Sequence, residues 1–140
     1  MLRLMPHVAA EESFALKGGT AINFFVWDMP RLSVDIDLTY LPIEPRAQSL
    51  GNISDALLRI KRSIVKASPG FNVHESKSGG LVLKLVVRAP ATEVKIEPNT
   101  VIRGAIHSVV TRDLSKKARA TFEAAVKVRT LSEPELFGGK

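Results

Sequence analysis

One segment of the chain, residues 32–40, constrains the fold more than any other. Its side chains alternate between apolar and polar, and this period of two predicts a β-strand. The apolar positions are Leu32, Val34, Ile36 and Leu38, and the polar positions are Ser33, Asp35, Asp37 and Thr39. The pattern therefore predicts a half-buried strand whose second face is polar.

Two aspartates, Asp35 and Asp37, share that polar face, because residues two apart on a strand project to the same side. Asp is depleted in strands, and like charges on one face repel each other. A cation or a positively charged partner between the two carboxylates would relieve the repulsion. We interpret the pair as functional, and the alternative is an ordinary solvated strand face.

A Gly-Gly-Thr turn at 18–20 precedes this strand in the sequence. Gly18 and Gly19 let the backbone turn sharply and approach a ligand, because no Cβ atom stands in the way. Thr20 can cap a helix over 21–27. A glycine turn beside two carboxylates is typical of a site that binds a metal ion and phosphate groups.

The remaining sequence predicts an α+β fold. Apolar residues at helical spacing mark a long helix over 46–67, and weaker patterns favour helices over 7–15 and 114–125. Strand patterns occupy 71–76, 81–88, 92–98 and 126–131, and 101–110 is compatible with a strand. Ser132 and Glu135 form a capping-box signature for one more helix.

The segment Thr92–Pro98 carries a second charged face. Glu93, Lys95 and Glu97 alternate with Val94 and Ile96, as on a half-buried strand. An antiparallel arrangement beside the aspartate strand would bring the two charged faces together. We therefore expect Glu97 to join the aspartates as a third carboxylate, and Pro98 to end the strand.

Composition narrows the possible chemistry and partners. The sequence has no cysteine, which excludes disulfides, thiolate nucleophiles and zinc sites built on sulfur, and favours a hard cation such as magnesium. Twenty Lys and Arg against 14 Asp and Glu give a net charge of +6, which makes a polyanionic partner plausible. With no apolar run long enough to span a membrane and no secretory signal, we expect a cytoplasmic protein without a membrane partner.

The order of these motifs resembles the nucleotidyltransferase fold of the DNA polymerase beta type. The segments LKGGTAIN, PRLSVDIDL and VKIEPN are similar to the AbiEii and MenT family of nucleotidyltransferase toxins from bacterial toxin-antitoxin and abortive-infection systems. The resemblance covers nearly the whole chain. It implies a nucleotidyltransferase core over 1–140, built on a mixed or antiparallel sheet of about five strands flanked by helices.

The resemblance also implies roles for individual residues. Lys17, Gly18, Gly19 and Thr20 correspond to the turn that holds the nucleoside triphosphate, consistent with anion binding at the start of a helix. Asp35 and Asp37 correspond to the carboxylates that bind magnesium or manganese.

Four further positions follow from the same resemblance. Glu97 corresponds to the third carboxylate, which joins the metal site and helps to activate the attacking hydroxyl. Lys95 would neutralise phosphate charge, and Arg31 and Ser33 belong to the segment that precedes the aspartates and contributes to nucleotide binding.

The implied reaction transfers a nucleoside monophosphate from an NTP to an acceptor hydroxyl. The acceptor is a tRNA 3′ end or a protein, and an antitoxin protein is a further expected partner. Family members continue into a helical C-terminal region that we expect to be absent here. Two alternatives therefore stay open: an inactive, truncated binding module, and a metal-dependent phosphohydrolase that uses the same acids.

Overall fold

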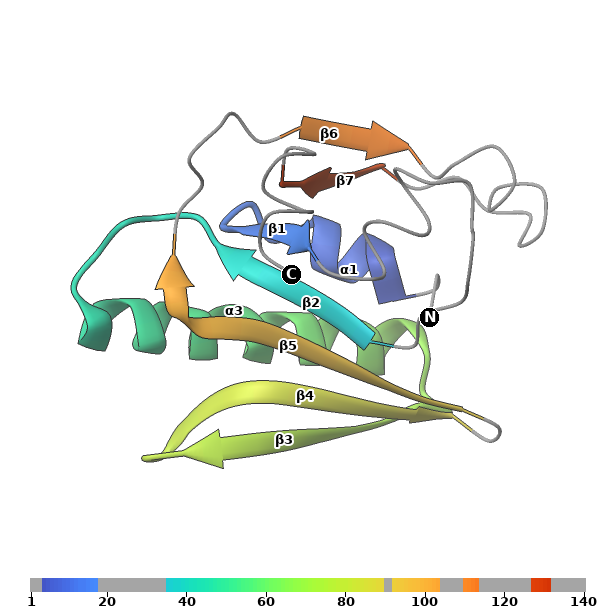
Figure 1. The fold of residues 1–140 in the computed structure, drawn as a ribbon. Helices are drawn as coiled ribbons and strands as arrows, with labels where there is room; N and C mark the ends of the chain where they lie inside the picture. Colours follow the sequence, from blue (N-terminus) through green and yellow to red (C-terminus); the bar gives the residue numbers. More distant parts are fainter. Residues whose placement is uncertain (1–3, 18–34, 90–91, 104–109, 114–126, 132–140) are drawn as a thin grey trace.

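The computed structural model describes residues 4–17, 35–89, 92–103, 110–113 and 127–131. Within these residues the chain forms two helices and a mixed sheet (Figure 1). The helices are α1 (Met5–Ala9) and α3 (Arg46–Ala67). The strands are β1 (Phe14–Lys17), β2 (Asp35–Tyr40), β3 (Asn72–Ser78), β4 (Leu81–Ala89), β5 (Thr92–Arg103), β6 (Val110–Asp113) and β7 (Lys127–Thr130).

The strands form one sheet in the order β3-β4-β5-β2-β1-β7-β6. Its seven strands exceed the five or so expected, because β1 and β6 are only four residues long and carry little periodicity. Two pairs are parallel, β2 with β5 and β1 with β7, and the other pairs are antiparallel. The predicted mixed α+β class is confirmed, and the predicted number of strands is wrong.

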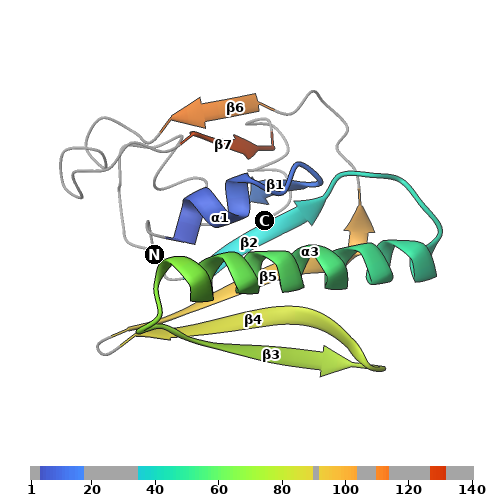
Figure 2. The ribbon, with the colours of Figure 1, turned by 180° about the vertical axis from the view of Figure 1, so that it is seen from behind.

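Helix α3 covers one face of the sheet, as the view from behind shows (Figure 2). The helix forms where its apolar spacing predicts, and it buries Ile53, Leu57, Ile60 and Ile64. These side chains pack with Ile36 and Leu38 of β2, Leu85 of β4 and Ile96 of β5 in one core. Helix α1 contacts both α3 and β7, and its buried Met5 and Val8 extend this core.

The path of α3 explains why β2 and β5 are parallel, where the sequence led us to expect an antiparallel pair. A helix of 22 residues spans about 33 Å and returns the chain to the end of the sheet where β2 began. The strands β3, β4 and β5 then alternate in direction, with Gly79 and Gly80 at positive φ in the tight turn between β3 and β4. After these reversals β5 runs in the same direction as β2.

Two predicted boundaries are wrong. The helix expected over 7–15 ends at Ala9, and Phe14 and Ala15 instead pair with Tyr40 and Thr39 in the sheet. The strand expected to end at Pro98 continues to Arg103. A proline has no N–H to donate, but it is tolerated in a strand beside a bulge, and the pairing of β2 with β5 becomes irregular directly after Pro98.

The other predicted elements divide into two groups. The long helix and the strands near 71–76, 81–88 and 126–131 are confirmed with small shifts in their ends. The helices expected over 21–27 and 114–125, the capping box at Ser132 and Glu135, and positions 32–34 lie outside the described residues.

Candidate active site

A row of three charged residues crosses three neighbouring strands. Lys17 of β1 pairs with Asp37 of β2, and Asp37 pairs with Glu97 of β5. Directly paired residues project to the same face of a sheet. The fold therefore brings Glu97 level with Asp37, as the sequence predicts, although it does so through a parallel pair.

A second row lies two residues earlier on the same strands. Asp35 of β2 pairs with Lys95 of β5, so on the polar face Lys95 has Asp35 as its cross-strand neighbour and Glu97 as its neighbour along β5. Asp35, Asp37 and Lys95 are half-buried, and Glu97 is exposed. The apolar residues between them, Ile36 and Ile96, are fully buried on the opposite face under α3. The alternation that predicts the strands thus also fixes the face on which the charges lie.

The row of three charges lines a cavity of about 390 Å³. The lining residues are Lys17, Asp37, Glu97, Pro98, Asn99 and Thr100. A cavity lined by two carboxylates, a lysine, an amide and a hydroxyl fits a ligand that has both charged and neutral polar parts.

The electrostatics of Asp37 reflect its crowded position. Burial raises the pKa of the Asp37 carboxyl above its ordinary value of 3.8, and the negative charges of Asp35 and Glu97 raise this pKa further. The positive charge of Lys17 acts in the opposite direction. Asp35 and Glu97 are therefore near enough to destabilise the negative charge of Asp37, which is the situation that a bound cation would relieve.

Within the described part of the chain, no three Asp, Glu or His side chains are already gathered around one point as a metal site. Asp37 and Glu97 are neighbours on adjacent strands, where backbones are about 5 Å apart, so side-chain rotation alone can bring their carboxylates together. The set of donors, all carboxylate oxygens, suits magnesium or manganese rather than a softer metal.

The structure does not describe several predicted site residues. Gly18, Gly19, Thr20, Arg31 and Ser33 lie outside the described residues. The residues that the sequence analysis missed are Pro98, Asn99 and Thr100, which line the cavity. The cue for them was Pro98, because a proline within a strand pattern can mark a bulge as well as a strand end.

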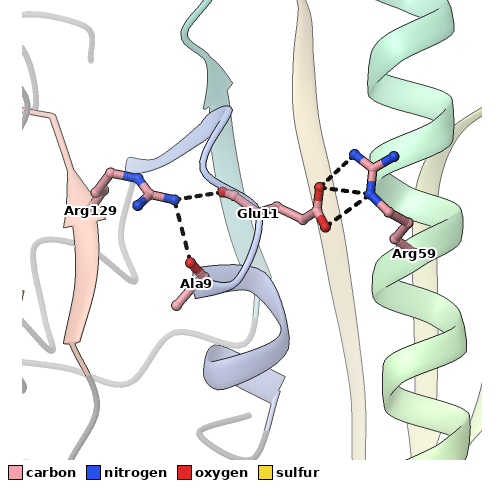
Figure 3. Close-up of polar contacts among 4 residues, drawn as sticks. All are labelled: Ala9, Glu11, Arg59 and Arg129. Carbon is pink, nitrogen blue, oxygen red and sulfur yellow. Dashed lines mark hydrogen bonds and ion pairs between the residues drawn. The ribbon is translucent and has the colours of Figure 1, made fainter.

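Strand β1, which carries Lys17, is anchored by a chain of polar contacts (Figure 3). The guanidinium of Arg129 on β7 donates to the carbonyl oxygens of Ala9 and Glu11, at 3.4 and 2.8 Å. The carboxylate of Glu11 in turn accepts hydrogen bonds from Arg59 of α3, the shortest at 2.7 Å. These contacts tie the α1–β1 turn to β7 and to α3, and so help to fix where β1 begins.

The family model of the nucleotidyltransferase AbiEii toxin, described as a type IV toxin-antitoxin system, matches residues 1–140. The chain belongs to the AbiEii nucleotidyltransferase toxin family. No curated protein sequence matches it. Among the described residues, no helix is long and apolar enough to cross a membrane.

A solved structure supports the same fold. MenT4, a nucleotidyltransferase toxin from Mycobacterium tuberculosis, superposes with a TM-score of 0.65 at 16% sequence identity. The match covers 95% of this AbiEii-family chain and 47% of MenT4, so the chain spans about half the length of that toxin. Terminal uridylyl transferase 4 from Trypanosoma brucei, solved with UTP and UMP, matches at a TM-score of 0.47 and 18% identity over 69% of this chain and 33% of its own.

Proposed function

We propose that this chain is the nucleotide-binding core of a nucleotidyltransferase that moves a nucleoside monophosphate from an NTP to an acceptor hydroxyl. The acceptor is RNA, such as a tRNA 3′ end, or a protein. The observation that carries the proposal is the row of Lys17, Asp37 and Glu97 along one cavity, in a chain of the AbiEii family. Its biological role would be that of a cytoplasmic toxin, held in check by an antitoxin partner.

Magnesium or manganese fits the acidic side of this cavity. Asp35, Asp37 and Glu97 would hold the ion. Burial, together with the charges of Asp35 and Glu97, raises the pKa of Asp37, and a divalent cation would stabilise the charged carboxylate. When bound, the ion supplies positive charge that offsets the charge of the phosphate oxygens.

The protein's own residues would divide the remaining tasks. The acceptor oxygen forms a bond to the α-phosphorus as the bond from that phosphorus to the pyrophosphate oxygen breaks, and pyrophosphate leaves with the electron pair. Glu97 would take the proton of the acceptor hydroxyl. Lys17 and Lys95 would offset charge on the phosphates, and the backbone of Gly18, Gly19 and Thr20, with Arg31 and Ser33, would bind the triphosphate.

The test is incubation of the purified protein with each α-labelled NTP, magnesium and total tRNA. We expect label on RNA, and loss of that label in Glu97→Gln. The matched control is Glu93→Gln, which removes an exposed carboxylate from the same strand, where it forms an ion pair with Arg88 at 2.8 Å. This variant should transfer as the parent does.

Other outcomes of the same assay would support the two alternatives, a phosphohydrolase and an inactive module. Labelled nucleoside mono- or diphosphate in solution, with none on RNA or protein, would indicate a phosphohydrolase. No turnover, together with no NTP binding by calorimetry, would indicate an inactive module. Label on protein alone would support nucleotidyl transfer with a protein, not RNA, as the acceptor.

A further inference from the structure

The pairing of β2 with β5 breaks just beyond the candidate site. Leu38 pairs with Pro98 and Tyr40 with Arg103, so β2 advances by two residues while β5 advances by five. The extra residues of β5, which include Asn99 and Thr100, therefore leave the regular ladder as a bulge. Bulges commonly redirect side chains beside active sites.

This bulge lines the cavity and is anchored from outside the sheet. Asn99 and Thr100 are both lining residues, and both are half-buried. The carbonyl oxygen of Thr100 accepts a hydrogen bond of 2.8 Å from the guanidinium of Arg46, the first residue of α3. The anchor satisfies a carbonyl in the irregular stretch and holds the bulge in place.

The bulge lies on the side of the charged row from which β1 approaches that row. Strand β1 runs antiparallel to β2 and ends at Lys17 beside Asp37, and Gly18 follows directly in the sequence. Pro98 instead pairs with Leu38, so the bulge lies toward the Tyr40 end of β2, from which β1 departs. Strand β1 therefore reaches the row of Lys17, Asp37 and Glu97 from the side of the bulge, and at Lys17 it is directed away from the bulge.

In-line phosphoryl transfer requires the attacking and leaving oxygens on opposite sides of the phosphorus. Glu97, the proposed base, lines the same cavity as the bulge, so a hydroxyl held at the bulge would lie beside Glu97. The pyrophosphate would then leave on the other side of the row, toward which β1 is directed. We infer that Asn99 and Thr100 form the acceptor subsite and bind the terminal ribose of an RNA acceptor. The inference rests on the function proposed above.

The chemistry of the subsite favours ribose over a protein hydroxyl. An amide and a hydroxyl together can donate to and accept from two neighbouring hydroxyl groups, as the 2′- and 3′-OH of a terminal ribose require. Positive charge near the subsite suits the RNA backbone. Leu85 of β4 pairs with Ile96 of β5, and one further step in this antiparallel register brings Lys84 beside Glu97. Lys84 is half-buried, and the net charge of the chain is +6.

The experiment compares Asn99→Ala and Thr100→Val with matched controls at fixed salt. The controls are Asn72→Ala on the edge strand β3 and Thr111→Val on β6, both exposed and outside the cavity. Each test variant should lower kcat/KM for tRNA by about tenfold, as expected for the loss of one hydrogen bond, with the affinity for NTP and magnesium unchanged by calorimetry. The control variants should have the same kcat/KM for tRNA as the parent protein.

A second measurement does not depend on turnover. Fluorescence anisotropy compares the binding of two short RNAs of the same sequence, one ending in a 3′-terminal ribose and the other in a 3′-terminal 2′-deoxyribose. The parent protein should bind the ribose-ended RNA several-fold more tightly, and Asn99→Ala should lose this preference.

The two measurements separate the failure of the inference from the failure of the proposed function. A parent protein that transfers nothing but keeps the ribose preference through Asn99 would refute the transferase and retain the subsite. The subsite is overturned by test variants that weaken NTP binding as much as transfer, by an unchanged ribose preference in Asn99→Ala, or by transfer to protein alone.

Discussion

The two faces of the central strands differ in what they contribute, although they share one backbone. Ile36, Leu38 and Ile96 point toward α3 and are fully buried. Asp37 and Glu97, their immediate neighbours, point the other way and line the cavity. The buried face contributes hydrophobic stabilisation to the core, whereas the polar face holds carboxylates in an environment unfavourable to the charge of Asp37. Substitutions one residue apart should therefore affect different properties.

The largest expected effect is on the polar face. Asp37→Asn should lower the rate of transfer by on the order of a thousandfold, because it removes a carboxylate of the proposed metal site. The free energy of unfolding should stay the same or rise, since the substitution also removes a repelled charge. Parallel assays of transfer and urea denaturation check both statements. A variant that unfolds at markedly lower urea would show that the charge supports the fold instead.

On the buried face, Ile36→Ala tests the adjacent position. It should lower the free energy of unfolding by about 2–5 kcal/mol, because it leaves a cavity in the core between β2 and α3. At a temperature where the variant remains folded, its affinity for NTP should be close to that of the parent. Denaturant titration and calorimetry measure the two quantities. A stable variant with lost NTP affinity would contradict the division between the two faces.

A smaller loss of stability is expected where α3 meets β4. The hydroxyl of the buried Ser54 accepts a hydrogen bond of 3.0 Å from the backbone N–H of Val82. Ser54→Ala leaves that N–H without its acceptor and should lower the free energy of unfolding by about 1–3 kcal/mol. Ser76→Ala, at an exposed position on β3, is the control and should be close to neutral by the same titration. Equal stability of the two variants would argue against this bond.

The smallest effect is a dependence of stability on pH. The pKa of Asp37 is raised in the folded state, so the folded chain binds more protons than the unfolded chain between pH 3.8 and the raised value. Through this window the Asp37 carboxyl should make the protein less stable as the pH rises. Urea titrations across pH in EDTA should show this contribution as the difference between the parent and Asp37→Asn. If the free energies of unfolding of the parent and of Asp37→Asn change with pH in the same way, the raised pKa of Asp37 is contradicted.

Much of the fold was predictable because its signals are local. The apolar stripe of α3, the glycine turn between β3 and β4, and the alternation of β2 each depend on neighbouring residues. Strands β1 and β6 were not predicted, because their short sequences lack a clear alternation and their pairing partners decide the structure. Phe14 illustrates this: its ring packs edge-on against Tyr40, with ring centroids 6.0 Å apart.

The candidate site divides in the same way. The sequence by itself determined which residue types are available and on which face of their strand they lie: Asp35 with Asp37, and Lys95 with Glu97. Only the tertiary structure decided that β2 and β5 are parallel, that Lys17, Asp37 and Glu97 fall in one row, and that a bulge places Asn99 and Thr100 in the cavity. The physical reason is that periodicity is a property of a single strand, whereas direction and register depend on the length of α3 and on pairing between distant segments.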